Sequence, residues 1–274
     1  MSLNDEIVRN FWNNQAGDTG YESEFGAGML IKDRHIAMHR KSIEERLFAK
    51  LITLHEGMEV LDIGCGTGRW SFLMAPNVAR VLATDISDEM IRTGGRLRQL
   101  ESASNVEFLV REALDISDLG QFDLIFIGGV LQYLSDDEVR TLTKRVVRAL
   151  KPRGACLTRD SVTSRRHAMC GDYPVVYRTR VQHNELCRAG GLELVTSERA
   201  YVMPALIPKI MRIAPLRGRF LDWAIRLDGL VMRNWPATWL LQIYAALTNR
   251  GCGEVPDHRF FLYRPADDDE AGRP

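Results

Sequence analysis

The chain has 274 residues, and its 36 basic and 36 acidic side chains give a formal net charge of zero. This balance provides no global field that would attract nucleic acid or an anionic membrane, so we expect no nucleic-acid partner. The five cysteines are scattered without a C-x-x-C pair, which fits neither a disulfide framework nor a structural zinc site, and we expect no metal.

The N-terminus, MSLNDEIVRNFW, is polar and lacks an apolar core of signal-peptide length. The longest uncharged run, residues 234–249, falls short of the roughly 20 apolar residues that a membrane-spanning helix needs. Together with the unpaired cysteines, these features predict a cytoplasmic protein in a reducing compartment.

Hydrophobic periodicity predicts an alternation of helices and strands. Apolar side chains recur at helical spacing over residues 34–55, which indicates an amphipathic helix. Short β-rich runs then alternate with helical or mixed segments, as in βαβ units with a parallel sheet, at residues 59–63, 80–84, 106–110, 122–127 and 155–158. Ser135 and Glu138 have capping-box spacing and start a helix that the turn at residues 151–154 stops.

The rest of the chain continues this pattern with one interruption. A helix at residues 179–189 ends at Gly190-Gly191, and strands follow at residues 192–201 and 258–264. Between these two strands, a segment rich in Leu, Ile, Met and Trp suits several short helices. We therefore divide the chain into an N-terminal lid and helix (1–55), an α/β core (56–202 and 251–265), a helical insertion (203–250) and a tail (266–274).

The stretch VLDIGCGTGRW, residues 60–70, places three glycines between a strand and a helix, where backbone N–H groups can face a ligand. A dinucleotide turn would need glycine or alanine at Arg69, which makes an NAD-dependent oxidoreductase an unfavourable alternative. Asp62, just before the turn, suits a cofactor that carries an ammonium group and no phosphate.

Asp85 follows the next strand at the distance from Gly64 that places a carboxylate beside a ribose. The competing interpretation is an N-cap for the helix at residues 87–98. If Asp85 binds the ribose, we expect its replacement by alanine to weaken cofactor binding with little loss of the fold, because a strand-end carboxylate should be exposed.

Five segments in order resemble the motifs of class I S-adenosylmethionine-dependent methyltransferases over about residues 56–160: VLDIGCGTG, ATDIS, REALDIS, FDLIFIGGVLQYL and ALKPRGACL. The resemblance implies a Rossmann-like, doubly wound α/β sheet of seven strands with the last strand antiparallel. An N-terminal helical lid and a helical insertion before the last strand would complete the chain. The implied cofactor is S-adenosyl-L-methionine.

The resemblance also implies roles for single residues. Asp62, Gly64 and Gly66, with Cys65 between the glycines, would surround the methionine part and the ribose, and Asp85 would hold the ribose hydroxyls. Ile86 would pack on the adenine, which Glu112 and Ala113 would contact. The family usually has glycine where this chain has Arg111. Gly128 would offer its carbonyl to the cofactor's ammonium.

Acceptor-side candidates are expected on loops after the fourth and fifth strands. Gln132 and Tyr133 follow the fourth strand, and Asp160 and His167 follow the fifth, with Tyr173 and Tyr177 just beyond. We take His167, Asp160 and Tyr133 as catalytic candidates, with His167 as the base because its pKa suits neutral pH; the competing interpretation is an exposed loop histidine. Arg159, Arg165 and Arg166 could pair with an anionic acceptor or form a solvated basic loop.

Residues 11–26 suit a lid that closes over the ligand, with Trp12 and Tyr21 as its wall. The basic, Trp-containing insertion at 203–250 has three interpretations: an acceptor cap or homodimer contact, a membrane-surface contact, or a structural brace.

We therefore expect a methyltransferase for a small-molecule acceptor, with transfer to oxygen. The alternatives are a non-catalytic regulatory or scaffold protein that binds the cofactor, or an enzyme that uses the cofactor for chemistry such as cyclisation.

Overall fold

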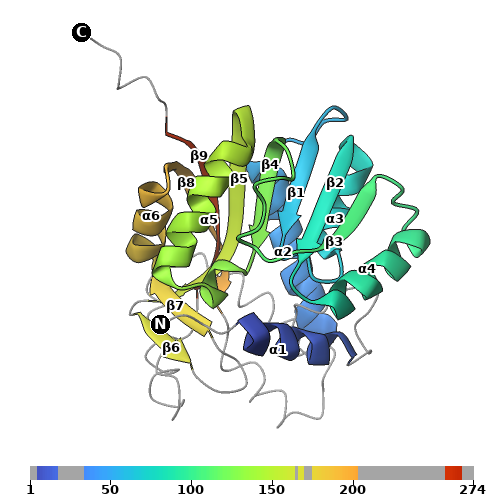
Figure 1. Cartoon of the computed structure of the whole chain (residues 1–274), viewed down its shortest axis with the longest axis horizontal. Coiled ribbons are helices and arrows are strands. Elements are labelled where there is room, and N and C mark those ends of the chain that lie inside the picture. Colours follow the sequence, from blue (N-terminus) through green and yellow to red (C-terminus); the bar gives the residue numbers. More distant parts are fainter. Residues whose placement is uncertain (1–4, 18–33, 164–165, 170–174, 203–256, 267–274) are drawn as a thin grey trace.

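The computed structural model of the protein describes residues 5–17, 34–163, 166–169, 175–202 and 257–266. In this part, the sheet has nine strands, of which two short ones are added at the end of β5 and the other seven have the order β3-β2-β1-β4-β5-β9-β8 (Figure 1). These seven are β1 Glu59–Ile63, β2 Arg80–Asp85, β3 Val106–Val110, β4 Phe122–Gly128, β5 Leu150–Thr163, β8 Leu192–Val202 and β9 Asp257–Pro265. β1 to β5 pair in parallel, and β9 runs antiparallel to both β5 and β8. The predicted seven-stranded sheet with an antiparallel last strand is confirmed.

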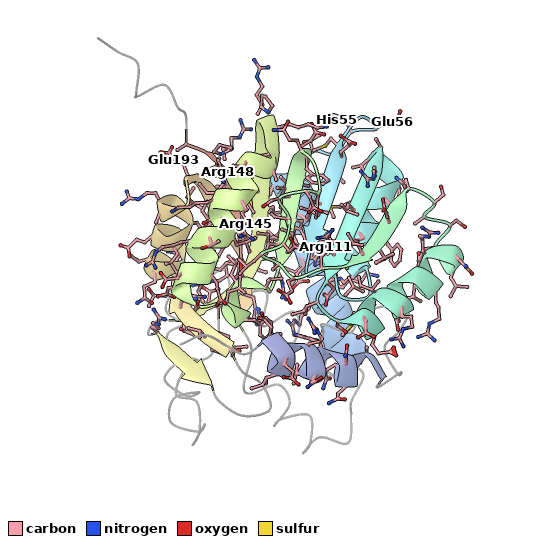
Figure 2. All side chains as sticks on the ribbon, viewed as in Figure 1. His55, Glu56, Arg111, Arg145, Arg148 and Glu193 are labelled. Atoms are coloured by element: carbon pink, nitrogen blue, oxygen red, sulfur yellow. The ribbon has the colours of Figure 1, made fainter. Side chains whose placement is uncertain are left out.

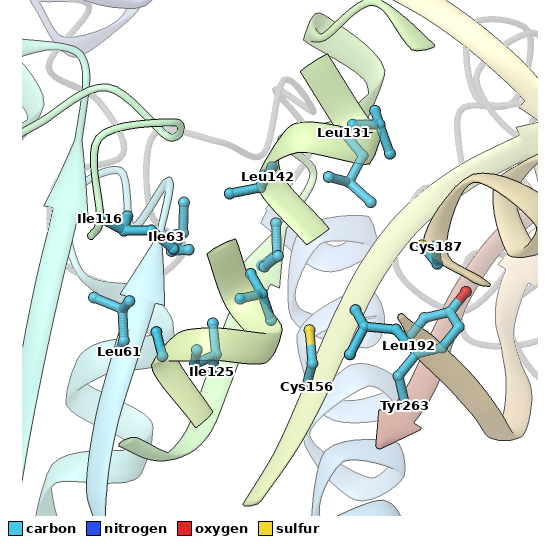
Figure 3. Close-up of a cluster of buried hydrophobic side chains, with 14 of the residues drawn as sticks. Leu61, Ile63, Ile116, Ile125, Leu131, Leu142, Cys156, Cys187, Leu192 and Tyr263 are labelled. Carbon is cyan, nitrogen blue, oxygen red and sulfur yellow. The ribbon is translucent and has the colours of Figure 1, made fainter. Parts of the chain in front are cut away.

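Helices cover both faces of this sheet (Figure 1). On one face, α5 (Asp136–Ala149) and α6 (Arg180–Ala189) pack on apolar strand residues, and Figure 3 shows Leu61 and Ile125 of the strands in this cluster with Leu142 of α5. On the other face, α2 (Arg34–Leu51) and α3 (Arg69–Met74) contribute to a second apolar cluster. The central strands β1, β2 and β4 are nearly continuous apolar runs because both of their faces are buried.

The helix start predicted at Ser135 has the expected capping box. At α5, Ser135 Oγ accepts from the Glu138 N–H at 3.3 Å, and Glu138 Oε2 accepts from the Ser135 N–H at 2.7 Å. α4 (Asp88–Leu100) starts at Ser87, whose Oγ accepts from the Met90 N–H. The first predicted helix, α2, ends at Leu51 rather than at residue 55.

The fifth strand is longer than predicted. Its pairing with β4 begins at Leu150, shifts register, and resumes at Ala155. The turn residues at 151–154 therefore form an irregularity within β5, where Arg153 takes a positive φ of 68°. Since β5 continues to Thr163, Asp160 lies inside a strand and not on the loop that we expected.

The expectation of a loop around His167 and Tyr177 was also wrong. β6 (His167–Met169) and β7 (Val175–Thr179) form an antiparallel ribbon. β5 extends past the last residue of β4, Gly128, so part of its edge is left for β7, which pairs with Val162 and Thr163. An unpaired strand edge favours such an addition, and Tyr177 therefore lies within a strand.

An additional helix, α1 (Asp5–Gly17), lies along the lower edge of the sheet in Figure 1. Residues 18–33, with Tyr21, lie outside the described residues, as do Tyr173, the insertion at 203–250 and residues 267–274. None of the helices in the described ranges is both long and apolar enough to cross a membrane.

Candidate active site

The glycine turn after β1 has the backbone that its sequence predicts. Gly64 and Gly66 have φ values of +71° and +57°, a region that favours glycine. A Cβ on Gly64 would lie 2.1 Å from Cγ2 of Val130, whereas a Cβ on Gly66 would meet no atom within 4 Å. Gly64 is therefore required by close packing, and Gly66 leaves open space for a ligand.

This turn borders a pocket of about 280 Å³ that lies at the carboxyl ends of β1, β2 and β4. His55 and Glu56, labelled in Figure 2, precede β1 and lie at the opposite edge of the sheet. All predicted cofactor-side residues except Asp62 and Cys65 line the pocket, namely Gly64, Gly66, Asp85, Ile86, Glu112, Ala113 and Gly128. The acceptor-side candidates Trp12, Gln132, Tyr133 and Tyr177 line the same pocket.

Asp85 lies at the end of β2 and is buried, contrary to the expected exposure. Its Oδ2 accepts from the Gly66 N–H and its Oδ1 from the Ser87 N–H, both at 2.9 Å. The N-cap of α4 is Ser87 rather than Asp85. Asp85 thus ties the glycine turn to the start of α4 while it faces the pocket.

Asp62 and Cys65 are buried and lie outside the pocket lining. Ser71 Oγ donates to Asp62 Oδ2 at 2.6 Å, and Asp62 Oδ1 is buried without a hydrogen-bond partner among the described residues. Burial raises the pKa of Asp62 to about 7 and that of the Cys65 thiol well above its usual value. An unpartnered carboxylate oxygen next to the turn suits a nearby cationic or hydrogen-bond-donating group.

Glu112, which follows β3 and also lines the pocket, contacts the N-terminal helix α1. Arg9 of α1 donates to Glu112 Oε1 at 3.3 Å, and both side chains are about half exposed. Arg111, labelled in Figure 2, pairs with Asp115 at 2.6 Å and with Asp118 at 3.0 Å. These carboxylates balance the charge of Arg111 at the position where the family usually has glycine.

Aromatic side chains from three elements form the opposite wall. Trp12 of α1 meets the ring of Tyr133 edge-on, with centroids 6.0 Å apart, and Tyr177 of β7 belongs to the same cluster. Tyr133 lies on a 3-10 turn, Leu131–Tyr133, that Arg178 of β7 holds through the carbonyls of Leu131 and Leu134. We therefore name Trp12, Tyr133 and Tyr177 the aromatic wall.

The structure does not bring Asp160 into the pocket. Side chains alternate along a strand, so Arg159 and Ser161 line the pocket while Asp160 lies on the other face of β5, 4.0 Å from Nε2 of His183. Burial raises the pKa of Asp160 to about 6. His167 begins β6, but its side chain lies outside the described residues.

Sequence reasoning missed Arg40, Ser161 and His258, all of which line the pocket. Ser161 and His258 are register partners on β5 and β9, and Ser161 Oγ lies 2.9 Å from His258 Nδ1. Burial, followed by the charges of Arg159 and Arg40, lowers the pKa of His258 well below its usual range, so its imidazole is neutral at pH 7. Ser161 could have been found from the sequence only if the fifth strand had been predicted to continue to residue 163. Strand alternation would then have placed Ser161 on the same face as Arg159.

A buried carboxylate on α2 organises the arginines beside His258. Glu44 Oε1 accepts from Nε and Nη2 of Arg159 at 3.0 and 2.5 Å, and Glu44 Oε2 accepts from Nη1 of Arg69 at 2.6 Å. The Arg69 guanidinium also stacks over Trp70, 4.7 Å from its ring centroid. Arg40 lies one helical turn before Glu44 and is buried as well. We call Arg40, Glu44, Arg69 and Arg159 the arginine cluster.

Residues 60–154 match a family model described as a methyltransferase domain. Residues 60–154 therefore form a class I methyltransferase domain. Phosphoethanolamine N-methyltransferase 1 of Arabidopsis thaliana is 30% identical over 160 residues. The methyltransferase domain predicted from the five motifs is confirmed, and its class takes the methyl group from S-adenosyl-L-methionine.

Solved structures with a similar fold include methyltransferase-related proteins. A complex of DhpI with SAH has a TM-score of 0.59 at 18% identity and covers 96% of this chain and 97% of that chain. The 4+2 cyclase SpnF has a TM-score of 0.60 at 18% identity, with 95% and 93% covered. The Arabidopsis match covers 57% of this chain but only 30% of the relative, so the chain spans less than a third of that relative's length.

Proposed function

We propose that this protein binds S-adenosyl-L-methionine and transfers its methyl group to a small-molecule acceptor. The observation that carries the proposal is that Gly66, Asp85 and Gly128 line the same pocket as the aromatic wall. Methyl transfer from a sulfonium is an in-line displacement, so a site that holds the cofactor and the acceptor in one cavity can gain much of its rate from their alignment.

The cofactor-side residues fit the groups of this cofactor. Asp85 faces the pocket where it can accept from ribose hydroxyls, and Ile86 offers an apolar surface for the adenine. The unpartnered Oδ1 of Asp62 suits the ammonium of the methionine part, directly or through water. When bound, the cofactor would supply the electrophilic methyl group, and the chain's residues would orient it.

We propose further that the acceptor atom is a hydroxyl oxygen, with His258 as the base in place of His167. A hydroxyl must lose its proton on methylation, and His258 lines the pocket with an unprotonated imidazole, although burial and the neighbouring arginines lower its basicity. The bond to Ser161 fixes the ring of His258 in the pocket. Gln132 and the aromatic wall would hold the acceptor.

Titration with S-adenosylhomocysteine by calorimetry tests the cofactor half of the proposal. Binding with a micromolar Kd supports it, and no binding at millimolar ligand contradicts it.

Reactions with methyl-labelled cofactor and a panel of small phenols, alcohols and amines test the transfer of the methyl group to an acceptor. Label in an acceptor, with an equal amount of S-adenosylhomocysteine, supports transfer, whereas an acceptor that changes while the labelled cofactor stays intact would favour non-methylating chemistry.

His258→Gln tests the base. We expect methylation of a hydroxyl acceptor to fall by about 10²-fold or more, the range of general base catalysis, while the Kd of S-adenosylhomocysteine changes less than threefold. His183→Gln is the matched control, because His183 is also a buried, neutral histidine but lies outside the pocket lining. Equal losses in the two variants would argue against a role for His258 as base.

A further inference from the structure

The turn between β4 and α5 carries two acceptor-side residues. Gln132 and Tyr133 of the 3-10 turn Leu131–Tyr133 line the pocket. The side chain of Leu131 packs in the apolar cluster with Leu142 of α5 (Figure 3). A single 3-10 turn cannot satisfy its last carbonyl groups by itself, so they need donors from outside the turn. The element that supplies these donors sets how the turn lies against the sheet.

Arg178 of β7 supplies the donors. Its Nη1 donates to the Leu131 carbonyl at 2.6 Å and its Nη2 to the Leu134 carbonyl at 2.5 Å. Its Nε donates to Oδ1 of Asp136, the first residue of α5, at 2.9 Å. The donors of a guanidinium form a rigid planar fork, so these three contacts fix the turn and the start of α5 relative to β7. The Arg178 side chain is 3% exposed, so water has little access to replace these contacts.

β7 also carries a residue of the aromatic wall, directly before Arg178. Adjacent strand residues point to opposite faces, so Tyr177 lines the pocket while Arg178 points toward the turn. Tyr133, on the turn, packs in one cluster with Tyr177. Arg178 is also the register partner of Val162, which follows the pocket residue Ser161 in β5. One buried guanidinium therefore joins the two segments that carry the tyrosines of the wall.

Asp136 keeps this contact charged on both sides. Burial alone would raise the pKa of Asp136, but hydrogen bonds from Arg166 and Arg178 lower it below its usual value, so the carboxylate is ionised at pH 7. Arg166 immediately precedes β6. Asp136 thus ties β7 and the residue before β6 to the start of α5.

The aromatic wall suits an acceptor that carries a ring. Aromatic rings attract one another in edge-on or offset arrangements, and the attraction depends on how the rings are oriented. Trp12 already meets Tyr133 edge-on, with centroids 6.0 Å apart. An acceptor ring that packs on the wall needs Tyr133 and Tyr177 at a fixed separation, and Arg178 provides the connection between them.

We propose that Arg178 is a positioning residue for the acceptor, an inference that rests on the proposed function. It holds the turn Leu131–Tyr133 against β7, so that Tyr133 and Tyr177 form one binding surface for a ring-bearing hydroxyl compound. Arg178 lies outside the pocket lining and acts through these tyrosines.

The test measures the acceptor side and the cofactor side separately. Arg178→Lys keeps the buried positive charge but loses the planar fork. The Kd of phenol, measured by ligand-detected NMR on the protein saturated with S-adenosylhomocysteine, should rise by about tenfold, the worth of one good aromatic contact. The Kd of S-adenosylhomocysteine, measured by calorimetry, should change by less than about twofold, because Gly66 and Asp85 on the cofactor side are held by their own hydrogen bond.

Arg180→Lys is the matched control, because Arg180 lies two residues further along the chain and is exposed. Asp136→Asn is a second variant, which weakens the same contact without changing Arg178 and should also raise the Kd of phenol selectively. Its control is Asp137→Asn, because the Asp137 side chain is 95% exposed and pairs with Arg140 at the surface. Melting temperatures show whether each variant is folded, and Asp136→Asn decides the question if Arg178→Lys does not fold.

A purely structural role would lower the melting temperature of Arg178→Lys and leave the Kd of phenol unchanged in the folded protein, which would overturn the proposal. Equal losses of affinity for phenol and for S-adenosylhomocysteine would overturn it as well. So would a lack of phenol binding to the unmodified protein saturated with S-adenosylhomocysteine. Failure of the unmodified protein to bind S-adenosylhomocysteine would instead contradict the proposed function.

Discussion

The buried carboxylate of Asp62 gives the proposed site a pH dependence at the scale of one residue. Its pKa of about 7 means that it is mostly neutral at pH 6 and mostly ionised at pH 8. An ammonium favours the ionised form, so the affinity for S-adenosylhomocysteine should rise by about tenfold from pH 6 to pH 8. Calorimetry across this range measures the slope.

Asp62→Asn provides the comparison, because it removes the ionisation and keeps the shape. We expect weaker binding and a flat pH profile; a slope equal to that of the unmodified protein would assign the dependence to another group. The free protein should tolerate the change. The pKa of Asp62 is raised from 3.8 on folding, so its ionisation costs stability as the pH rises from 4 to 7, and asparagine avoids that cost.

Asp85 combines a structural and a binding role, so its replacement should affect both. In Asp85→Asn the side-chain oxygen can accept from only one of the two N–H groups, those of Gly66 and Ser87, that the carboxylate now satisfies. We expect a loss of about 1–3 kcal/mol in the free energy of unfolding, the usual cost of an unsatisfied buried group, and at least tenfold weaker S-adenosylhomocysteine binding. Urea unfolding and calorimetry measure the two effects, and unchanged affinity would contradict the ribose assignment.

At the scale of elements, α1 is held over the pocket by polar contacts with the start of α4. Asn13 Nδ2 donates to Asp88 Oδ1 at 3.2 Å, and Ser87 Oγ donates to Asn13 Oδ1 at 2.5 Å. α1 also contacts the pocket lining through Arg9, which donates to Glu112, and through Val8 and Trp12, which pack in one cluster with Tyr133 and Tyr177. α1 therefore completes the pocket with few contacts of its own.

We expect Asn13→Ala to speed amide hydrogen exchange in residues 5–17 severalfold without a matching change in the sheet, because α1 can then open locally. S-adenosylhomocysteine should slow exchange in the same segment, since the helix lines the pocket. Asn14→Ala is the control, because Asn14 lies on α1 and is exposed. Equal effects of the two substitutions would mean that the Asn13 contacts do not hold the helix.

The elements differ in how far the sequence predicts them. The central strands β1, β2 and β4 were predictable because a strand buried on both faces is a nearly unbroken apolar run. The β6–β7 ribbon was not predictable, because it pairs with the part of β5 that extends beyond the last residue of β4, Gly128. The sequence does not show where one strand continues past its neighbour. For the same reason, Asp160 was expected on a loop and is found inside β5.

The two sides of the pocket differ in the same way. The cofactor side is built from residues that directly follow β1, β2, β3 and β4, so the motifs identify them in order. Arg40, Ser161 and His258 come from α2, β5 and β9, and their shared position depends on the antiparallel pairing of β5 with β9 and on how α2 packs. Neither is a local property of the sequence. The charged pair Arg40 and Glu44 even interrupts the helix face that was expected to be apolar.

At the scale of the whole molecule, Glu44 joins three elements that lie far apart in the sequence. It links α2 to Arg69 at the start of α3 and to Arg159 within β5, and its side chain is fully buried. Its removal would leave two mostly buried guanidiniums, 13% and 16% exposed, without their shared carboxylate. This cost differs from that of a surface ion pair, because water cannot replace the lost partner.

We therefore expect Glu44→Ala to lower the free energy of unfolding by about 3–5 kcal/mol, the range for breaking a buried ion pair. Glu45→Ala, which breaks a surface contact with Lys41, should cost at most about 1 kcal/mol. Urea unfolding measures both values. Similar stability losses in the two variants would show that the arginine cluster does not join these elements.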